Sequence, residues 1–440
     1  MTEERIRIEK LAFGGSGVGR ISGKVCFVPY SCPGDELTVR ITSEKRSYVT
    51  AAIIEVITPG DDRVTPPCPL FGSCGGCSWQ HVAYGRQLAE KRQIFAETLW
   101  RGGRIPGELI GDIVASPANY GYRSRVQLKL NADNGKLRIG FYRQGTHFVD
   151  DVCQGCPVAV PVVNQVLAQL RELLRTFPEP TRIPQISIDA AEQGVVTIVS
   201  YIGSDRNGTA DFFNKRRDEL ENVTGLYLQT GKKSTFQKVF GNGELSYSLP
   251  SNSTAASPCS LSYRPGAFAQ VNTLQNSALL RLVQTFADCS NNDRVLDLYC
   301  GNGNFSLPLA GSVSSITGIE EYADSIAAAQ DNSRHNGITN AEFICADAAV
   351  GIKRLIHDGR YFETVILDPP RSGAVDVLSD ILRLKPERII YVSCDPSTLA
   401  RDCGVLSAGG YGVESSVPVD MFPQTYHLES VTLLKLRPRS

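Results

Sequence analysis

The sequence lacks the features that mark membrane and secreted proteins. It contains no run of 18 or more apolar residues, which a helix needs to cross a bilayer. Its N-terminus, MTEERIRIEK, is charged and has no apolar core of the kind that a secretory signal carries. Internal repeats and low-complexity segments are also absent. We therefore expect a globular cytoplasmic protein with no membrane partner, whose cysteines are in a reducing compartment.

A large excess of charge of one sign is also missing. The formal net charge is −1, which argues against a protein that coats nucleic acid through bulk attraction. Residues 1–150 nevertheless carry 20 Lys and Arg against 15 Asp and Glu, so the small basic excess is N-terminal. This asymmetry favours an N-terminal half that docks its partner electrostatically, joined to a neutral or acidic half that carries the activity.

With 440 residues, the chain is long enough for roughly three domains. Residues 1–58 contain short alternating β runs broken by Gly and Pro, which predict a small barrel. Residues 59–262 contain mainly strand-like segments, with a helix predicted at 161–176, and indicate a mixed, mainly β central domain. A helix is also predicted at about 86–101, with packing on the third domain as one option. Residues 263–440 alternate strands with helices, as in a doubly wound α/β sheet.

Polar residues stand at the ends of the strands predicted in this third domain. Open α/β sheets bind their ligands at that edge. DLYCGNGNF supplies Asp297 and then Gly301 and Gly303, which predict a tight turn. Packing alone favours apolar residues, so successive acids at strand ends indicate a binding edge, at which Glu320 is suited to hydrogen-bond ribose hydroxyls. The acids on the later strand ends are Glu320, Asp347 and Asp368.

The ligand at this edge is not expected to be a dinucleotide. The third glycine of the G-x-G-x-x-G fingerprint is replaced by Ser306. A phosphate-free adenosyl ligand such as S-adenosylmethionine fits a carboxylate-rich edge better, because its sulfonium is cationic. The last two strands, near 411–419 and 431–437, are joined without an obvious helix, and we expect one of them to be antiparallel.

Five motifs carry a family resemblance: FAQVN, VLDLYCGNGNFSLPLA, LDPPRSG, YVSCDPSTLARD and MFPQTYHLES. Together they resemble the RNA (uracil-5-)-methyltransferases, which make 5-methyluridine in ribosomal and transfer RNA. The resemblance implies a Rossmann-type S-adenosylmethionine-dependent methyltransferase domain at residues 263–440. It also implies that residues 1–58 are a TRAM module, an OB-like RNA-binding barrel. The cofactor-binding residues that it implies are Gln270, Tyr299, Asn304, Glu320, Asp347 and Asp368.

Cys394, in YVSCDPSTLA, is the candidate nucleophile. A single cysteine at a strand end is by itself more typical of packing. Uracil C5, however, is too electron-poor to take a methyl group until a thiolate has added to C6. We expect the site to lower the pKa of Cys394, through the N-terminus of a helix starting near Pro396. Cys300, which has apolar neighbours, is interpreted as a packing residue.

Glu429, in YHLES, matches the family's base that removes the C5 proton. Without the resemblance it would be interpreted as a solvated loop acid. His427 could assist or orient. Amino-group methyltransferases are a rival class with a D-P-P motif, but they follow it with an aromatic residue, where this chain has Arg371.

Cysteines cluster in CPLFGSCGGCSW and again in DDVCQGCPV. Their C-x-x-C spacings leave zinc and iron–sulfur sites equally open. The resemblance implies a [4Fe–4S] cluster, with Cys153 left over. Its implied ligands are Cys68, Cys74, Cys77 and Cys156. We expect the cluster to fix the fold of the RNA-binding half, because the reaction has no redox step.

The predicted partner is RNA with an exposed or flipped-out uridine. NYGYRSRVQLKL could form an RNA-facing surface or an ordinary solvated face, through Tyr120, Tyr122, Arg123, Arg125 and Lys129. We predict a monomeric enzyme that methylates uracil C5 in 23S rRNA. The alternatives are the same reaction on tRNA and, in another class, a non-catalytic iron–sulfur RNA-binding scaffold.

Overall fold

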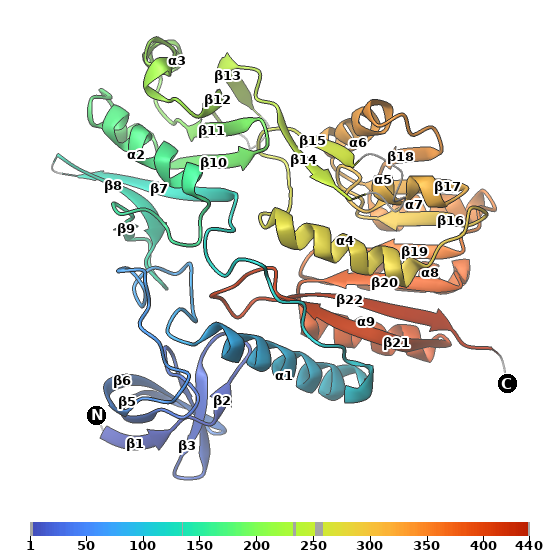
Figure 1. Cartoon of the computed structure of the whole chain (residues 1–440), viewed down its shortest axis with the longest axis horizontal. Helices are drawn as coiled ribbons and strands as arrows, with labels where there is room; N and C mark the ends of the chain where they lie inside the picture. Colours follow the sequence, from blue (N-terminus) through green and yellow to red (C-terminus); the bar gives the residue numbers. More distant parts are fainter. Residues whose placement is uncertain (1–2, 134, 232–234, 251–257, 439–440) are drawn as a thin grey trace.

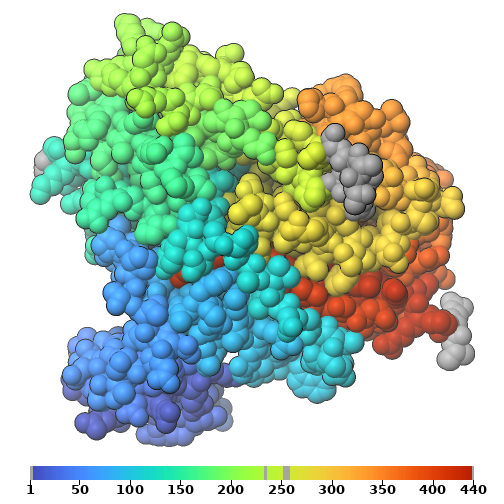
Figure 2. All heavy atoms as spheres, viewed as in Figure 1, coloured from blue at the N-terminus to red at the C-terminus, as the bar shows by residue number. Residues whose placement is uncertain are grey.

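A computed structural model describes residues 3–133, 135–231, 235–250 and 258–438. Its three large sheets follow one another along the chain (Figure 1). No helix of these residues is long and apolar enough to cross a membrane. In the space-filling view the N-terminal sheet projects from one corner of the molecule (Figure 2).

The N-terminal sheet has six strands in the order β1-β5-β6-β4-β3-β2. Its alternating apolar residues point to one interior, which contains Ile6, Val28, Leu37 and Val39. This pattern is that of strands wrapped around a small core. The strands are β1 (Glu3–Arg7), β2 (Lys10–Leu11), β3 (Gly17–Ile21), β4 (Lys24–Val28), β5 (Glu36–Glu44) and β6 (Tyr48–Thr58).

The central sheet has seven strands in the order β13-β12-β11-β10-β7-β8-β9. The strands are β7 (Arg125–Asp133), β8 (Lys136–Tyr142), β9 (Val149–Asp151), β10 (Gln185–Ala191), β11 (Gly194–Ser200), β12 (Val223–Gln229) and β13 (Phe236–Gly241). Helix α2 (Pro161–Arg175) packs its apolar face on this sheet, and the helix predicted at 161–176 is confirmed. A second helix, α3 (Arg206–Lys215), was not predicted, because its polar sequence with Gly208 in the first turn is typical of a loop.

The C-terminal sheet has the order β18-β17-β16-β19-β20-β22-β21. Its first five strands are parallel and β22 is antiparallel to both neighbours, so the expected reversal is confirmed. The strands are β16 (Arg294–Leu298), β17 (Ser315–Glu320), β18 (Ala341–Cys345), β19 (Thr364–Leu367), β20 (Arg388–Ser393), β21 (Tyr411–Val419) and β22 (Glu429–Leu436). The helices are α4 (Thr273–Ala287), α5 (Ser306–Leu309), α6 (Ala323–His335), α7 (Ala348–His357), α8 (Val375–Leu384) and α9 (Pro396–Ala408).

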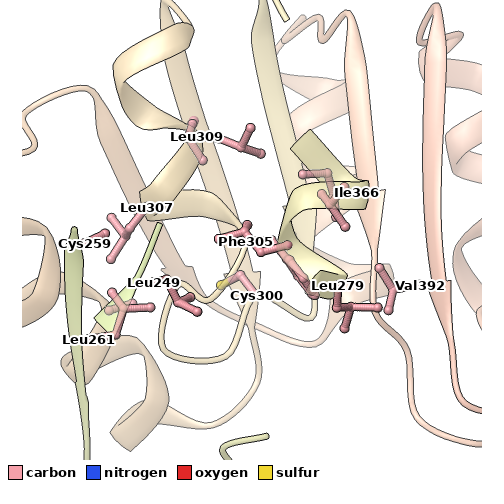
Figure 3. Packing of buried hydrophobic residues seen from close by; sticks show 14 of the residues in the cluster. Leu249, Cys259, Leu261, Leu279, Cys300, Phe305, Leu307, Leu309, Ile366 and Val392 are labelled. Carbon is pink, nitrogen blue, oxygen red and sulfur yellow. The ribbon is translucent and has the colours of Figure 1, made fainter. Parts of the chain in front are cut away.

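Two apolar clusters cover the two faces of this sheet. On one face Leu279 of α4 lies beside Ile366 and Val392 of the sheet (Figure 3). Cys300 is 3% exposed within the same cluster, so its interpretation as a packing residue is confirmed. Helices α7, α8 and α9 cover the other face. Buried apolar layers on both sides explain why the strands are almost continuously apolar.

The hairpin of β14 (Leu245–Leu249) and β15 (Cys259–Tyr263) packs into the first of these clusters. Leu249 and Leu261 lie with Leu307 of the C-terminal part (Figure 3). The predicted boundary between residues 262 and 263 falls within β15. The packing supports a boundary before β14 instead.

Helix α1 (Tyr84–Gly103) lies between the N-terminal barrel and α9 (Figure 1). Its Phe95 and Leu99 belong to the apolar cluster under α9. An added Cβ at Gly103 would lie 2.8 Å from the Ala400 carbonyl oxygen, so only glycine permits this close approach. On its other side, α1 binds the barrel, where Glu90 Oε2 accepts a hydrogen bond from the Leu11 amide (2.7 Å).

Candidate active site

Acidic side chains from adjacent strands gather at the carboxyl edge of the C-terminal sheet. Leu298 pairs with Ile319 and with Leu367, which places Asp297, Glu320 and Asp368 along one edge. Asp297 is fully buried, and its Oδ2 accepts a hydrogen bond from the Ser306 hydroxyl. Burial raises the pKa of Asp297 to about 7, and burial together with the Asp297 and Glu320 charges raises that of Asp368 to about 7. An edge that holds carboxylates so close together favours a cationic ligand.

The turn from β16 to α5 is tight enough for its backbone to approach a ligand. Tyr299, Gly301 and Gly303 all have positive φ, at 67°, 55° and 92°. The φ of 92° at Gly303 strains any side chain, and an added Cβ would also lie 2.7 Å from Leu307 Cδ1, so this position favours glycine. Glu320 holds the turn, because its Oε2 accepts a hydrogen bond from the Gly301 amide (3.3 Å).

The remaining residues predicted to bind the cofactor lie around this turn. The Asn304 side-chain amide exchanges hydrogen bonds with that of Asn276 (2.8 and 3.1 Å), and its Oδ1 also accepts one from the Tyr247 hydroxyl (3.0 Å). Asp347 is exposed, and its Oδ1 caps α7. Gln270 is half-buried in the segment before α4, on which Asn276 lies. The network of Asn276 and Tyr247 was missed, because those side chains are 28 and 57 residues from Asn304.

Cys394 and Glu429 come from adjacent antiparallel strands. Ser393 at the end of β20 pairs with Ser430 of β22, and the Ser430 hydroxyl donates to the Ser393 carbonyl oxygen (3.2 Å). The next residues along the two strands are Cys394 and Glu429. Cys394 is half-buried, and Glu429 is 6% exposed at the start of a strand, so it is not a solvated loop acid.

The expectation that the site lowers the pKa of Cys394 is wrong for the free protein. Burial, and then the Glu429 and Asp368 charges, raise this pKa to about 12, and Arg371 opposes them. The amides at the N-terminus of α9 are already engaged, because Asp395 Oδ1 accepts hydrogen bonds from Ser397 (2.8 Å) and Thr398 (3.1 Å). Helix N-terminal amides therefore act on Asp395 rather than on the thiol.

Glu429 shares this electrostatic environment. Burial and the Asp368 charge raise the pKa of Glu429 well above its usual range, and Arg371 acts in the opposite direction. Burial and the neighbouring carboxylates thus favour the protonated forms of both the Cys394 thiol and the Glu429 carboxyl group in the free protein. Positive charge brought to this edge would lower the pKa of both groups.

His427 lies against Tyr426, with the ring centroids 4.2 Å apart. Burial and the nearby cations Arg371 and Lys91 lower the pKa of His427 to about 4. The imidazole is therefore neutral at physiological pH, which suits an orienting role better than that of a general acid.

The proposed RNA-facing strand does not present all its side chains to solvent. Tyr122 is 6% exposed and donates its hydroxyl to the Pro423 carbonyl oxygen (2.9 Å). Arg125 is paired with Asp189 (2.5 Å) and lies over the Tyr263 ring. Tyr122 and Arg125 thus form neither an RNA-facing surface nor an ordinary solvated face. Their side chains join the central sheet to the C-terminal part.

The four cysteines predicted to hold a metal cluster lie near one another, three from CPLFGSCGGCSW and one from DDVCQGCPV. Burial raises the pKa of Cys77 to about 12, and the neighbouring Cys156, Cys74 and Cys68 add to the rise. Cys153 is exposed. Among the described residues, no three His, Cys, Asp or Glu side chains are spaced to hold a single metal ion. The four thiols thus lie near one another without forming a mononuclear site.

The fold and the edge together define a class. Five parallel strands with a reversed strand inserted near the end, an acidic carboxyl edge and a glycine turn without a phosphate-binding fingerprint are those of a Rossmann-type S-adenosylmethionine-dependent methyltransferase. A crystal structure of a Pyrococcus abyssi tRNA (uracil-54, C5)-methyltransferase in complex with S-adenosyl-L-homocysteine has this fold. The TM-score is 0.73 at 24% identity, covering 98% of this chain and 100% of that one.

Family models place the chain more narrowly. The model for tRNA (uracil-5-)-methyltransferase matches residues 83–437, and that for the TRAM domain matches residues 2–54. The chain belongs to the tRNA (uracil-5-)-methyltransferase family, with a TRAM domain at its N-terminus.

Curated relatives align over nearly the whole chain. The 23S rRNA (uracil(1939)-C(5))-methyltransferase RlmD of Aeromonas salmonicida is 34% identical over 95% of this chain and 93% of its own length. That of Stenotrophomonas maltophilia is 33% identical over 99% and 100%. An uncharacterized RNA methyltransferase of Thermosynechococcus vestitus is 36% identical over 98% and 97%.

Proposed function

We propose that this protein methylates C5 of a uridine in 23S rRNA, with S-adenosylmethionine as the methyl donor. The observation that carries the proposal is the placement of Cys394 and Glu429 on adjacent strands, at the edge that also holds Asp368. The full-length relatives that act on 23S rRNA support this substrate. The tRNA enzyme of the same fold, at lower identity, makes tRNA the second candidate.

The proposed chemistry assigns one role to each group. S-adenosylmethionine supplies the methyl group as an electrophile on a positively charged sulfur. The Cys394 thiolate adds to uracil C6, which makes C5 nucleophilic. After C5 has been methylated, Glu429 removes its proton while the bond between Cys394 and C6 breaks. The raised pKa of Glu429 suits it to hold that proton.

The donor pocket is proposed to consist of Gln270, Tyr299, Asn304, Glu320, Asp347 and Asp368. The acidic edge and the glycine turn fit a cationic adenosyl ligand. Because the Asn304 amide already bonds Asn276 and Tyr247, its role would be to fix the turn as well as to contact the ligand.

We also propose a [4Fe–4S] cluster on Cys68, Cys74, Cys77 and Cys156. A single metal ion holds its sulfurs about 4 Å apart, whereas a cluster of eight atoms separates them further. The support for the cluster is that Cys68, Cys74 and Cys156 lie close enough to Cys77 to raise its pKa, which gives the four cysteines that such a cluster requires. Backbone amides also support it, since Val158 and Ala159 donate to Cys156 and Gly76 to Cys74. Such hydrogen bonds are a usual feature of iron–sulfur sites.

We further propose a monomeric cytoplasmic enzyme of three units: the TRAM barrel of residues 1–58, the cluster-bearing central unit and the methyltransferase unit. The central unit would end before β14, and α1 would belong by its packing to the third unit. A non-catalytic RNA-binding scaffold is the alternative in another class.

The decisive experiment measures methyl transfer from labelled S-adenosylmethionine to unmodified 23S rRNA and, separately, to unmodified tRNA. We expect label in 23S rRNA, at C5 of uridine, and none with Cys394→Ala. Label in tRNA alone would replace the substrate. Label in neither RNA would refute the proposal that the protein is an RNA methyltransferase. Methyl transfer by Cys394→Ala would refute the thiol mechanism.

A further inference from the structure

The loop of residues 420–428, which joins β21 to β22, ends directly before Glu429. At its centre Gln424 is 1% exposed and has a φ of 67°. A residue other than glycine, asparagine or aspartate seldom adopts this left-handed conformation, which persists only where surrounding contacts hold it. Those contacts come from the cysteine-rich segment and from α1.

The main chain after Cys77 binds the loop directly. The amides of Ser78 and Trp79 both donate to the Gln424 carbonyl oxygen, each at 3.0 Å. The Ser78 hydroxyl oxygen accepts a hydrogen bond from the Tyr426 amide (3.2 Å). Three hydrogen bonds thus join residues 78–79 to a loop more than 340 residues later in the sequence.

Gln87 of α1 binds the loop from the other side. We call Gln87 and the main chain of Ser78 and Trp79 the clamp on Gln424. Its Nε2 donates to Gln424 Oε1 (2.9 Å), and its Oε1 accepts from the Gln424 amide (3.0 Å). The same Nε2 also lies within hydrogen-bond distance of the carbonyl oxygens of Trp79 (3.0 Å) and Val82 (2.8 Å), so its two hydrogens are shared among three acceptors. Gln87 is fully buried, so each lost bond leaves a polar group without water to replace it.

Trp79 fixes the clamp to the N-terminal barrel. It is fully buried, and its indole Nε1 donates to the Gly15 carbonyl oxygen (2.9 Å). The loop therefore rests on a platform made by the barrel, the cysteine-rich segment and α1 together.

The position of the loop bears on the base, because Glu429 is at the last rung of its ladder. It pairs with Val419, and beyond that rung both strands leave the sheet. The ladder therefore holds the Glu429 main chain from one side, and the 420–428 loop holds it from the other. A loop that moved by about 1 Å would misplace the carboxyl group by a distance that matters to catalysis.

We propose that Gln424 is a positioning residue, clamped by Gln87 and by the main chain of Ser78 and Trp79, which aligns Glu429 to remove the C5 proton. This inference rests on the proposed function. Because proton removal accompanies the breaking of the Cys394–C6 bond, a misaligned base slows release of the RNA more than it slows addition or methyl transfer.

The test compares two glutamines of α1. Gln87→Ala removes the clamp, and Gln93→Ala is the matched control, since Gln93 is exposed and bonds only to Glu97 among the described contacts (3.0 Å). For each, single-turnover methyl transfer to the RNA substrate is measured beside the fraction of protein that migrates with RNA under denaturing conditions.

With Gln87→Ala we expect release of methylated RNA to slow about 10- to 100-fold, while methyl transfer slows less than about threefold. Covalent protein–RNA adduct then accumulates, with the methyl group already on the uridine. Gln93→Ala should match the wild type. Binding of S-adenosylmethionine by calorimetry should be unchanged in both variants.

A parallel fall in transfer and release, or no accumulated adduct, would overturn the positioning role. If Gln87→Ala proves unfolded by circular dichroism, Ser78→Ala, which removes the acceptor of the Tyr426 amide, takes its place with the same expected partition. A wild-type protein that neither methylates RNA nor forms adduct would refute the proposed function. A normal partition in the variants of an active enzyme would refute the clamp alone.

Discussion

The Nζ of Lys91 in α1 lies 2.5 Å from Oδ1 of Asp420, and both side chains are fully buried. Lys91 also donates to the Phe422 carbonyl oxygen (3.0 Å), and the Tyr84 hydroxyl donates to the second Asp420 oxygen (2.8 Å). The pair thus ties the first α-helix to the start of the 420–428 loop. A buried pair of this kind adds little net stability, but removing one partner is costly.

We predict that Lys91→Met destabilises the protein by about 3–5 kcal/mol, because the Asp420 carboxylate is left buried and unpaired. Lys91→Met combined with Asp420→Asn should recover more than half of the loss. Chemical denaturation followed by circular dichroism measures both. Arg175→Met is the control: its partner Glu172 is largely exposed, so the change should be under about 1 kcal/mol. Equal losses for Lys91→Met and Arg175→Met would contradict the prediction.

Alkylation of Cys394 in the free protein should be slow and strongly dependent on pH. With a pKa of about 12, its thiolate is about one part in 10⁴ at pH 8, and its rate should still rise tenfold per pH unit from pH 8 to 9.5. A cysteine in an unstructured peptide, with the ordinary thiol pKa of about 8.5, should begin to level off over this range. Mass spectrometry of the Cys394 peptide after iodoacetamide treatment measures the rate.

The neighbours of Cys394 set the direction of further changes. Asp368→Asn and Glu429→Gln remove charges that raise the thiol pKa, so both should speed alkylation, whereas Arg371→Met should slow it. A Cys394 rate that levels off below pH 9 in the wild type would show that the thiol is already activated without substrate.

Asp297→Asn should change how stability depends on pH. The Asp297 pKa is about 7 in the folded protein and near 3.9 in the unfolded chain, so the folded state binds more protons between these values. Wild-type stability therefore falls as the pH rises from 4 to 7, by on the order of 3 kcal/mol from this group. The Asp297→Asn variant lacks this contribution, so its free energy of unfolding relative to that of the wild type should increase from pH 5 to pH 8. Denaturation at four pH values tests this, and a constant difference would refute it.

We predict that Cys156 binds the iron–sulfur cluster and that Cys153 does not. Anaerobically purified protein is expected to contain about four irons and four sulfides per chain and to absorb in the visible. Cys156→Ser should lose most of the iron, and Cys153→Ser, at the neighbouring exposed position, should keep it. Iron retained in Cys156→Ser and lost in Cys153→Ser would exchange the two assignments, and zinc in place of iron would refute the cluster.

Local sequence patterns were sufficient for the strand–helix alternation of the C-terminal sheet, for α2 and for the reversed β22, because these depend on apolar periodicity and short connections. They also placed acids at strand ends, since a strand end follows directly from the strand. The family resemblance, and not periodicity, picked out Glu429. What the sequence could not supply was the thiol environment, which depends on Glu429 and Asp368 from other strands.

Long-range polar pairs were likewise invisible in the sequence. Arg125 and Tyr122 have the composition of a basic, aromatic surface, yet Asp189 and the Pro423 carbonyl oxygen draw them into the interior. Nothing local to either residue marks a partner 64 or 301 residues away. The clamp of Gln87 on Gln424 is of the same kind.

The place of α1 also affects how the protein is made. Asp420 follows Lys91 by 329 residues, an interval that a ribosome takes roughly 15–65 s to translate. For most of that time the helix can pack on the barrel through Ile94, but Lys91 lacks its counter-ion and Phe95 and Leu99 lack the residues of α9 that cover them. The final strands to emerge thus complete the packing of the first α-helix to be synthesised.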